Sequence, residues 1–319
     1  MDPLISVIMS TYNEKMEWIK RSVNSILNQT YKNIEFIIIV DNPTNQKLIN
    51  LLKKYQESDN RIKLIINKQN MGLVKSLNIA LEHCRGTYIA RMDADDIADV
   101  NRLNIQKEFL EKHDLDFVFS SMMLIDEGDN PFDETNRAEL TSIQVKRALE
   151  ISNVATHPTW FLKKEVYDSL NGYRDVPYCE DYDFSLRSLQ KGFRIGKVNQ
   201  NLLKYRIRTN GISHSNALEQ YLNARGILSL YKKKQLDNDR LVNDLIRKTK
   251  KQATVIEKEN FSNARVYLSN GLALIKRNKK IKGVLEILKS TFTSKYHTLK
   301  NIDLISYKIK SKINLFSKY

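Results

Sequence analysis

Short apolar runs alternate with amphipathic segments along the first 115 residues of the chain. The runs have the length of strands, and the segment from 14 to 28 repeats its apolar residues at helical spacing. Because each expected strand is followed by an expected helix, the strands should be joined by crossovers into a mostly parallel sheet. The expected strands are 4–9, 34–40, 62–66 and 87–91, and the expected helices are 14–28, 45–57 and one that places Leu73, Leu77, Ala80 and Leu81 in register.

The alternation loosens after residue 115. We expect a short strand at 117–120, an irregular acidic loop at 126–134 and a helix at 141–150. From about residue 216 the pattern is almost wholly helical, with few glycines or prolines. The sequence therefore predicts an α/β domain over 1–230, with a Rossmann-like sheet flanked by helices, and a helical region over 231–319.

The charge of the chain changes at the same boundary. Residues 1–230 contain 30 Lys or Arg and 30 Asp or Glu, whereas residues 231–319 contain 22 and 7, so the C-terminal region carries the whole net charge of +15. A neutral body with a cationic extension argues against an enzyme that is basic throughout and acts on nucleic acid.

Two cysteines are too few for a disulfide framework, which predicts a reducing, cytoplasmic location. The first residues do not resemble a secretory signal, and no apolar stretch approaches the length of a membrane span. Secretion and membrane spanning are therefore not expected, whereas peripheral binding to a membrane stays open.

Polar residues follow each of the first four expected strands. Ligands of parallel α/β sheets bind at the carboxyl ends of the strands, so these residues are expected to share one site. They are Thr11, Tyr12, Asn13 and Glu14 after the first strand, Asp41 after the second, Asn70 after the third, and Asp93, Asp95 and Asp96 after the fourth.

Asp93 and Asp95 are spaced to converge on one hard cation. Carboxylates in this arrangement bind Mg²⁺ or Mn²⁺ and leave coordination positions open for substrate phosphates. The alternative is an acidic loop in which Asp96 or Asp99 caps the next helix. The position at the end of the fourth strand favours the metal site.

Glu180 and Asp181 open a helical pattern. A helix N-terminus stabilises carboxylates, and such a group can equally be the general base for an attacking hydroxyl, so the sequence leaves both roles open. His214 follows a cationic stretch that suits phosphate, and it is a candidate third metal ligand. His157 precedes Pro158 and is expected to line a pocket.

Glycine-rich phosphate loops and the Gly-x-Ser-x-Gly elbow of hydrolases are missing from the sequence. The pieces that are present resemble, in order, the inverting family-2 glycosyltransferases of bacterial cell-surface polysaccharide synthesis, which have the GT-A fold. The resemblance covers about residues 4–215. It rests on residues 6–14, 25–31, 35–41, 70–73, 89–96 with Arg102, 180–183 and 205–206.

The resemblance implies a metal-dependent hexosyl- or N-acetylhexosaminyltransferase that uses a nucleotide-sugar, with uridine the expected nucleoside. Asp181 would be the base and Glu180 would support it, while Asp93 and Asp95 would bind Mn²⁺ or Mg²⁺ with the diphosphate and His214 would complete that site. Many relatives have Asp-Asp-Gly-Ser after the second strand, where this chain has Asp41 followed by Asn42, Pro43 and Thr44. The resemblance also implies contacts to the nucleoside from Thr11, Tyr12, Glu14 and Asp41. Residues beside the diphosphate would be Asn70, Lys75 and Arg91. Residues around the acceptor or the pocket would be His157, Tyr205 and Arg206.

The last residues, from Leu304 onward, combine apolar residues near helical spacing with lysines. This pattern suits an anionic membrane surface, and equally a helix packed on the body or on a second subunit of a homo-oligomer. The family often uses glycan or lipid-linked glycan acceptors, which favours peripheral binding at the inner face of the plasma membrane.

Two further functions fit parts of the sequence. A nucleic-acid-binding protein could use the basic tail, but few aromatic residues are interleaved with its lysines, and no nucleic acid partner is expected. A sugar-nucleotide pyrophosphorylase would share the α/β body, but the glycine-rich loop expected after the first strand is missing.

Overall fold

The computed structural model describes residues 2–135, 137–208, 216–303 and 305. Contacts within the chain divide it into two compact units. The first comprises residues 1–149, 153–175 and 180–209, and the second comprises 150–152, 176–179 and 210–319. The boundary that the charge suggests, residue 230, lies inside helix α9 (Ala217–Lys232). A catalytic part over 1–230 remains a prediction.

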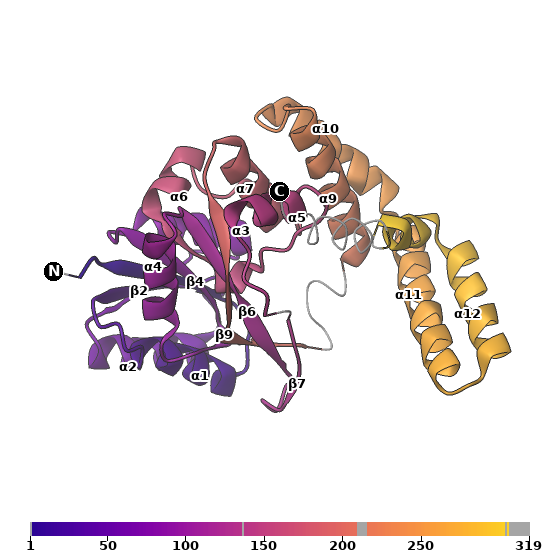
Figure 1. The fold of residues 1–319 in the computed structure, drawn as a ribbon. Helices are drawn as coiled ribbons and strands as arrows, with labels where there is room; N and C mark the ends of the chain where they lie inside the picture. Colours follow the sequence, from indigo (N-terminus) through magenta and orange to yellow (C-terminus); the bar gives the residue numbers. More distant parts are fainter. Residues whose placement is uncertain (1, 136, 209–215, 304, 306–319) are drawn as a thin grey trace. The chain divides into compact units, whose positions relative to one another are not determined.

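A sheet of nine strands forms the centre of the first unit (Figure 1). Its strand order is β3-β2-β1-β4-β8-β6-β9-β5, with β7 paired to β6. The strands are β1 (Ile5–Thr11), β2 (Ile34–Val40), β3 (Ile62–Ile66), β4 (Tyr88–Asp93), β5 (Ile97–Ala98), β6 (Phe117–Ile125), β7 (Pro131–Glu134), β8 (Phe161–Lys163) and β9 (Ile195–Arg206).

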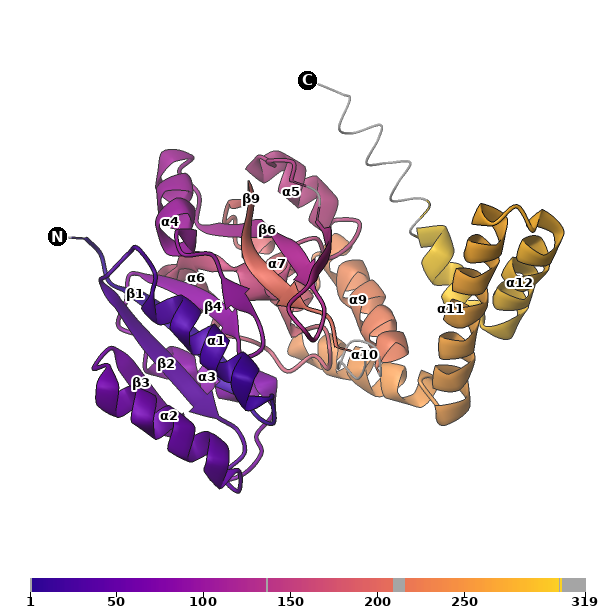
Figure 2. The same ribbon diagram turned by 90° about the horizontal axis from the view of Figure 1, so that it is seen from below.

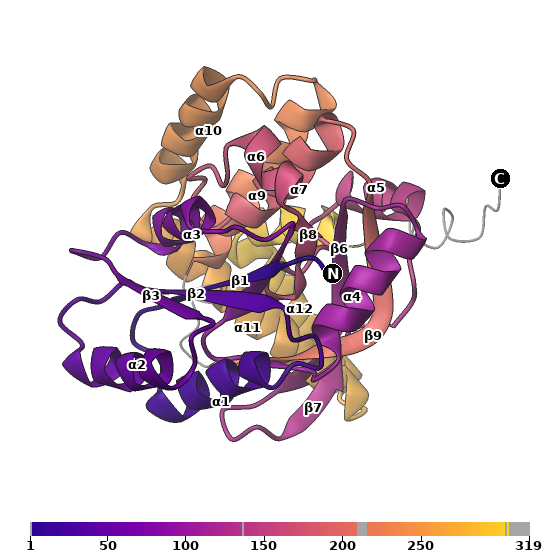
Figure 3. The same cartoon turned by 90° about the vertical axis from the view of Figure 1, so that its left-hand side faces the viewer.

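The first four strands are parallel, as the sequence predicts. All seven residues of β2 are buried, because helices cover both faces of this half of the sheet. Helices α1 (Met16–Leu27) and α2 (Gln46–Ser58) lie on one face and α3 (Leu73–Glu82) on the other (Figure 3). Right-handed crossovers require this change of face, because β4 lies on the opposite side of β1 from β2 and β3.

The register brings the ends of three strands level with one another. Thr11 of β1 pairs with Val40 of β2, and Ser10 pairs with Asp93 of β4. The polar residues that follow these strands therefore meet at one edge of the sheet, as expected.

Beyond β4 the sheet is mixed. The short strand β8 is antiparallel to both β4 and β6, whereas β6 and β9 are parallel. The sequence pattern did not predict β8 or β9, and it gave the segment 126–134 as irregular where β7 forms at its end. The remaining helices of this unit are α4 (Arg102–Lys112), α5 (Ser142–Leu149), α6 (Lys164–Leu170) and α7 (Glu180–Gln190), with a 3₁₀ turn at His157–Thr159.

The described part of residues 216–305, which belongs to the second unit, is mainly helical. It contains α9, α10 (Asp239–Gln252), α11 (Val255–Lys276), α12 (Lys280–Thr293) and a further helix at 295–303. Leu218, Ala253 and Phe261 form its buried apolar cluster. No helix among the described residues is both long and apolar enough to span a bilayer. The amphipathic stretch expected from Leu304 onward lies almost entirely outside the described residues.

Helices α11 and α12 form an antiparallel hairpin that crosses at two glycines (Figure 2). A Cβ on Gly271 would lie 2.7 Å from the backbone oxygen of Gly283, and a Cβ on Gly283 would lie 2.7 Å from that of Gly271. Ser290 Oγ donates a hydrogen bond of 2.6 Å to the Ala264 carbonyl farther along the same contact. The hairpin therefore depends on close approach of two backbones.

Gly271→Ala should destabilise the hairpin by about 1–3 kcal/mol, because the new methyl group meets backbone that cannot move independently of its helix. Urea denaturation followed by circular dichroism at 222 nm measures the effect. Ser269→Ala, an exposed position on the same helix, is the matched control and should change stability by less than about 0.5 kcal/mol. Equal stability of the two variants would contradict a tight crossing.

Candidate active site

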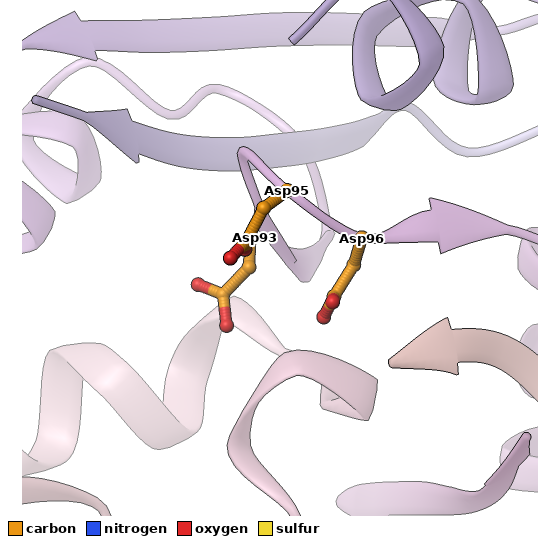
Figure 4. Close-up of side chains that lie close together, drawn as sticks. All are labelled: Asp93, Asp95 and Asp96. Carbon is orange, nitrogen blue, oxygen red and sulfur yellow. The ribbon is translucent and has the colours of Figure 1, made fainter. Parts of the chain in front are cut away.

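Three carboxylates gather in the turn that ends β4. Asp93, Asp95 and Asp96 each place a ligand atom within 4.8 Å of the others, and Figure 4 shows their side chains leaving the turn toward the same side. The turn is held by Ser22 Oγ, which donates to the Asp93 carbonyl at 2.8 Å, and by the backbone N–H of Arg206, which donates to Asp96 Oδ1 at 2.9 Å. The carboxylates are thus fixed by neighbours on both sides.

The cluster has more negative charge than its surroundings compensate. Burial, followed by repulsion from Asp93, raises the pKa of Asp95 to about 6, against the pull of Arg208, whose Nε lies 2.9 Å from Asp95 Oδ2. Burial and the two neighbouring acids raise the pKa of Asp96 well above its usual range. Asp96 Oδ2 is buried and has no hydrogen-bond partner in the described part of the chain. A hard divalent cation fits this oxygen-rich set, because it would supply the missing positive charge.

Arg91 lies between this cluster and a second pair of acids. Its side chain is buried and forms an ion pair with Asp93, while Nε and Nη1 are buried without hydrogen-bond partners among the described residues. Although burial disfavours the charged form, Asp93 holds the pKa of this guanidinium above its ordinary value. The same cation lowers the pKa values of Glu180 and Asp181 relative to burial alone.

Glu180 and Asp181 are the first two residues of α7, where the helix dipole favours anions. Asp181 accepts hydrogen bonds from Asn153 Nδ2 at 2.9 Å and from the Tyr182 N–H at 2.7 Å. Burial, then the charge of Asp181, raises the pKa of Glu180 to about 8. Burial also raises the pKa of Asp181, and its two hydrogen bonds oppose that rise. Burial and the neighbouring Asp181 carboxylate therefore favour the protonated form of Glu180.

His157 lies behind the acidic pair. Its Nδ1 is 3.7 Å from Glu180 Oε1, and its Nε2 is 2.8 Å from the Tyr173 hydroxyl. Tyr173 in turn is 2.8 Å from the Tyr167 hydroxyl. Burial lowers the pKa of His157 well below its ordinary value, so the neutral ring is favoured. This ring can form hydrogen bonds without adding charge to the site.

The loop after β1 presents an exposed aromatic ring above an internal hydrogen-bond network. Glu14 Oε2 accepts from Thr11 Oγ1 at 2.7 Å and from the Tyr12 N–H at 2.8 Å, which leaves the Tyr12 ring 42% exposed. Asn13 accepts from Asn42 Nδ2 at 2.7 Å and so ties this loop to the one after β2.

Asp41 shapes the loop that follows β3. Its carboxylate accepts from Asn67 Nδ2, from the Met71 N–H and from the Gly72 N–H, at 2.7–2.8 Å. Gly72 has φ of +82°, which favours glycine at this entry to α3. Asn70 Oδ1 accepts from the same Gly72 N–H at 3.0 Å. Asp41 therefore already holds the segment in which Asn70 lies, and Lys75 is exposed on the helix that follows.

Tyr205 and Arg206 end β9 beside the acidic turn. The pKa of Tyr205 is raised by burial and by the three aspartates. Arg206 is buried; its Nε donates to the Asp95 carbonyl at 2.8 Å and its Nη1 to the Asp126 carbonyl at 2.9 Å. Arg206 therefore fastens the acidic turn to a neighbouring loop. His214, the expected third ligand, lies outside the described residues.

The sequence of residues 6–170 matches the model of glycosyl transferase family 2. The chain belongs to this family. Of the three functions that fit the sequence, family membership supports the first, and this chain is a glycosyltransferase.

Relatives and structural neighbours agree with this assignment. The chain is 38% identical over 206 residues to an uncharacterised glycosyltransferase of Methanocaldococcus jannaschii, covering 64% of this chain and 71% of the relative. It is 34% identical over 220 residues to the O-antigen biosynthesis glycosyltransferase WbnJ of Escherichia coli, covering 68% and 85%. The fold is similar to TarS 1–349 of S. aureus, solved in complex with UDP-GlcNAc, with a TM-score of 0.58, 16% identity and 89% of each chain covered. This likeness confirms the GT-A fold.

Several residues around the site were not predicted from the sequence of this family-2 enzyme. Asn153, which binds Asp181, lies in an irregular segment with no motif around it. Arg102 belongs to the motifs of the resemblance, but they assign it no role; it is fully buried, and its Nη2 donates to the Arg91 carbonyl at 2.7 Å. The alternative in which Asp96 or Asp99 caps α4 is wrong, because the N-cap of that helix is Asn101.

Arg91→Gln should lower the free energy of unfolding by about 3 kcal/mol, because it leaves the acids around it without their buried cation. Chemical denaturation at pH 7 measures the loss. Arg147→Gln, an exposed arginine on α5, is the control and should cost less than about 0.5 kcal/mol. A loss at Arg91 no larger than at Arg147 would show that the carboxyl groups do not depend on this guanidinium.

Proposed function

We propose that this chain transfers a sugar, with inversion, from a uridine-diphosphate sugar to a glycan hydroxyl during synthesis of a surface polysaccharide, and that the reaction requires Mn²⁺ or Mg²⁺. The observation that carries the proposal is the position of Arg91, which forms an ion pair with Asp93 and lies close enough to Glu180 and Asp181 for its charge to lower their pKa values. A donor diphosphate at the first group would place its anomeric carbon toward the second.

In this proposal the two acids of α7 have different tasks. Asp181, oriented by Asn153 and the Tyr182 N–H, accepts the proton of the acceptor hydroxyl as that oxygen attacks the anomeric carbon. Glu180 is protonated and donates or accepts hydrogen bonds without adding a second negative charge beside the base. A divalent cation at Asp93, Asp95 and Asp96 would neutralise charge on the leaving diphosphate.

The donor and acceptor classes are supported by chemistry and by similarity. TarS was solved with UDP and with UDP-GlcNAc, and WbnJ is named for O-antigen biosynthesis. For this chain we propose that the exposed Tyr12 ring stacks on the nucleobase, with Thr11, Glu14 and Asp41 shaping that end of the site and Asn70 and Lys75 beside the diphosphate. Tyr205 and His157 would line the acceptor side, at the cytoplasmic face of the membrane, with His214 near the metal.

Metal binding should depend on pH through the acidic cluster. Because the pKa of Asp95 is raised to about 6, protons compete with the cation below that value, and Mn²⁺ affinity should fall about tenfold for each pH unit below 6. Isothermal titration calorimetry of Mn²⁺ binding with UDP present, between pH 5 and 8, measures this. Asp95→Asn should weaken Mn²⁺ binding by more than about 100-fold. Asp99→Asn, the exposed aspartate of the same segment, should bind as the unmodified chain does; a flat pH profile would contradict the metal site.

The division of roles between Asp181 and Glu180 can be tested by amide substitutions. Asp181→Asn should lower kcat for UDP release from a UDP-sugar by about 10²–10⁴-fold while UDP binding persists. Glu180→Gln imitates the protonated acid and should keep kcat within about tenfold at pH 7. Asp168→Asn on the surface of α6 is the control. If Glu180→Gln lost as much activity as Asp181→Asn, the charged form of Glu180 would be the one required.

A further inference from the structure

Helix α12 exposes a stripe of apolar side chains. Ile281, Leu285, Leu288 and Phe292 recur every three or four residues and so share one side of the helix, and they are 81%, 53%, 48% and 86% exposed. A helix of a water-soluble protein normally turns such a stripe toward a core. This stripe has no cover within the described part of the second unit.

The stripe begins in a dense cluster of positive charge. In the turn between α11 and α12, five of the seven residues from 276 to 282 are Lys or Arg, and no Asp or Glu occurs between Glu259 and Glu286. All five cations are exposed. The tip of the hairpin therefore combines Ile281 with a cationic ring, and we call the stripe and these five cations together the hairpin face.

An open groove runs along the two helices on this face. Arg277, Lys282 and Lys289 line it together with Leu274, Leu285 and Phe292. Glu286 also lines the groove and forms an ion pair with Lys289 at 2.7 Å, so Arg277 and Lys282 supply its excess positive charge. A groove with cations beside aliphatic and aromatic side chains can take an anionic headgroup and the start of its acyl chains.

We propose that the hairpin face binds an anionic lipid bilayer. Positive charge attracts the headgroups, and the apolar stripe enters the boundary between headgroups and acyl chains. A single bilayer therefore offers anionic headgroups to the five cations and an apolar region to the stripe. A second copy of the chain would cover the stripe but would bring the same uncompensated cations to the interface, where like charges repel.

This placement moves the expected membrane contact from the last residues of the chain to α11 and α12. The membrane-binding inference rests on the proposed function in one respect: binding would hold the enzyme where a lipid-linked acceptor is presented. Binding itself requires neither donor nor metal, so it can be measured apart from activity.

The test is cosedimentation of the full chain with vesicles of phosphatidylcholine alone or with 30% phosphatidylglycerol, at 50 to 500 mM NaCl. We expect binding to the anionic vesicles at 100 mM NaCl, little binding to the neutral ones, and weaker binding as salt rises. Equal binding to both vesicle types, or none to either, would overturn the proposal without any variant being needed.

Two variants divide the contributions. The charge variant is Lys279→Gln/Lys280→Gln/Lys282→Gln, and it should lower the partition coefficient into anionic vesicles roughly 100-fold. Its control is Lys248→Gln/Lys250→Gln/Lys251→Gln, which removes the same charge from exposed sites on α10 and should lower the partition coefficient less than about fivefold. The apolar variant is Leu288→Gln/Phe292→Gln, and it should lower the partition coefficient at least about tenfold. Its control is Ile143→Gln/Phe132→Gln, which changes exposed apolar side chains of the first unit and should leave the partition coefficient unchanged. Equal losses in variant and control would overturn the proposal.

Sedimentation velocity of the same samples tests the competing occupant. A dimer that dissociates in Leu288→Gln/Phe292→Gln, with lipid binding unchanged, would assign the stripe to a second copy and overturn the proposal. UDP release from the donor should be the same in all four variants, because none of the changed residues belongs to the catalytic site. Loss of lipid binding with normal UDP release, or the reverse, keeps this inference and the proposed function separately testable.

Discussion

The guanidinium of Arg91 is buried close to two groups of acids in the candidate active site. Arg91 is the positive neighbour of Asp93, Asp96, Glu180 and Asp181, which come from the end of β4 and the start of α7. Its position is set by backbone, because its N–H donates to the Trp160 carbonyl at 3.0 Å and its carbonyl accepts from Arg102. Trp160, which directly precedes β8, and the buried Arg102 of α4 therefore fix the backbone from which this guanidinium extends.

The arginines around the site do not fully offset the effect of burial: the pKa of Asp95 stays raised against the pull of Arg208, and the pKa values of Asp96 and Glu180 stay raised against the pull of Arg91. The raised pKa values of Asp95, Asp96 and Glu180 show that the fold, as it stands, favours protons on these groups. A divalent cation would remove that preference at the Asp93 end, whereas Glu180 can relieve it at the other end only by keeping its proton. The two ends of the site thus differ in how their negative charge is offset.

The parallel half of the fold could be predicted because its signals are local. Apolar runs such as 34–40 are continuous, and the register then brings Thr11, Asp41 and Asp93 to one edge. Strand β9 could not be predicted, because Lys197, Asn199 and Gln200 interrupt its apolar pattern and its pairing with β6 is non-local. The same limit applies to side chains: Arg206 was expected near the acceptor, and only the structure shows that it donates to the Asp95 and Asp126 carbonyls and pairs with Asp129.

The chemistry of α12 follows from a constraint on how it packs. Gly283 and Ser290 face α11, because only small side chains permit the close crossing with Gly271. Ile281, Leu285, Leu288 and Phe292 lie on other sides of the helix, so α12 cannot rotate to bury them without losing that crossing. The hairpin fold therefore leaves the apolar stripe exposed next to the densest positive charge in the chain. The net charge of +15 belongs to residues 231–319, of which the hairpin face carries five cations, whereas residues 1–230 are neutral overall.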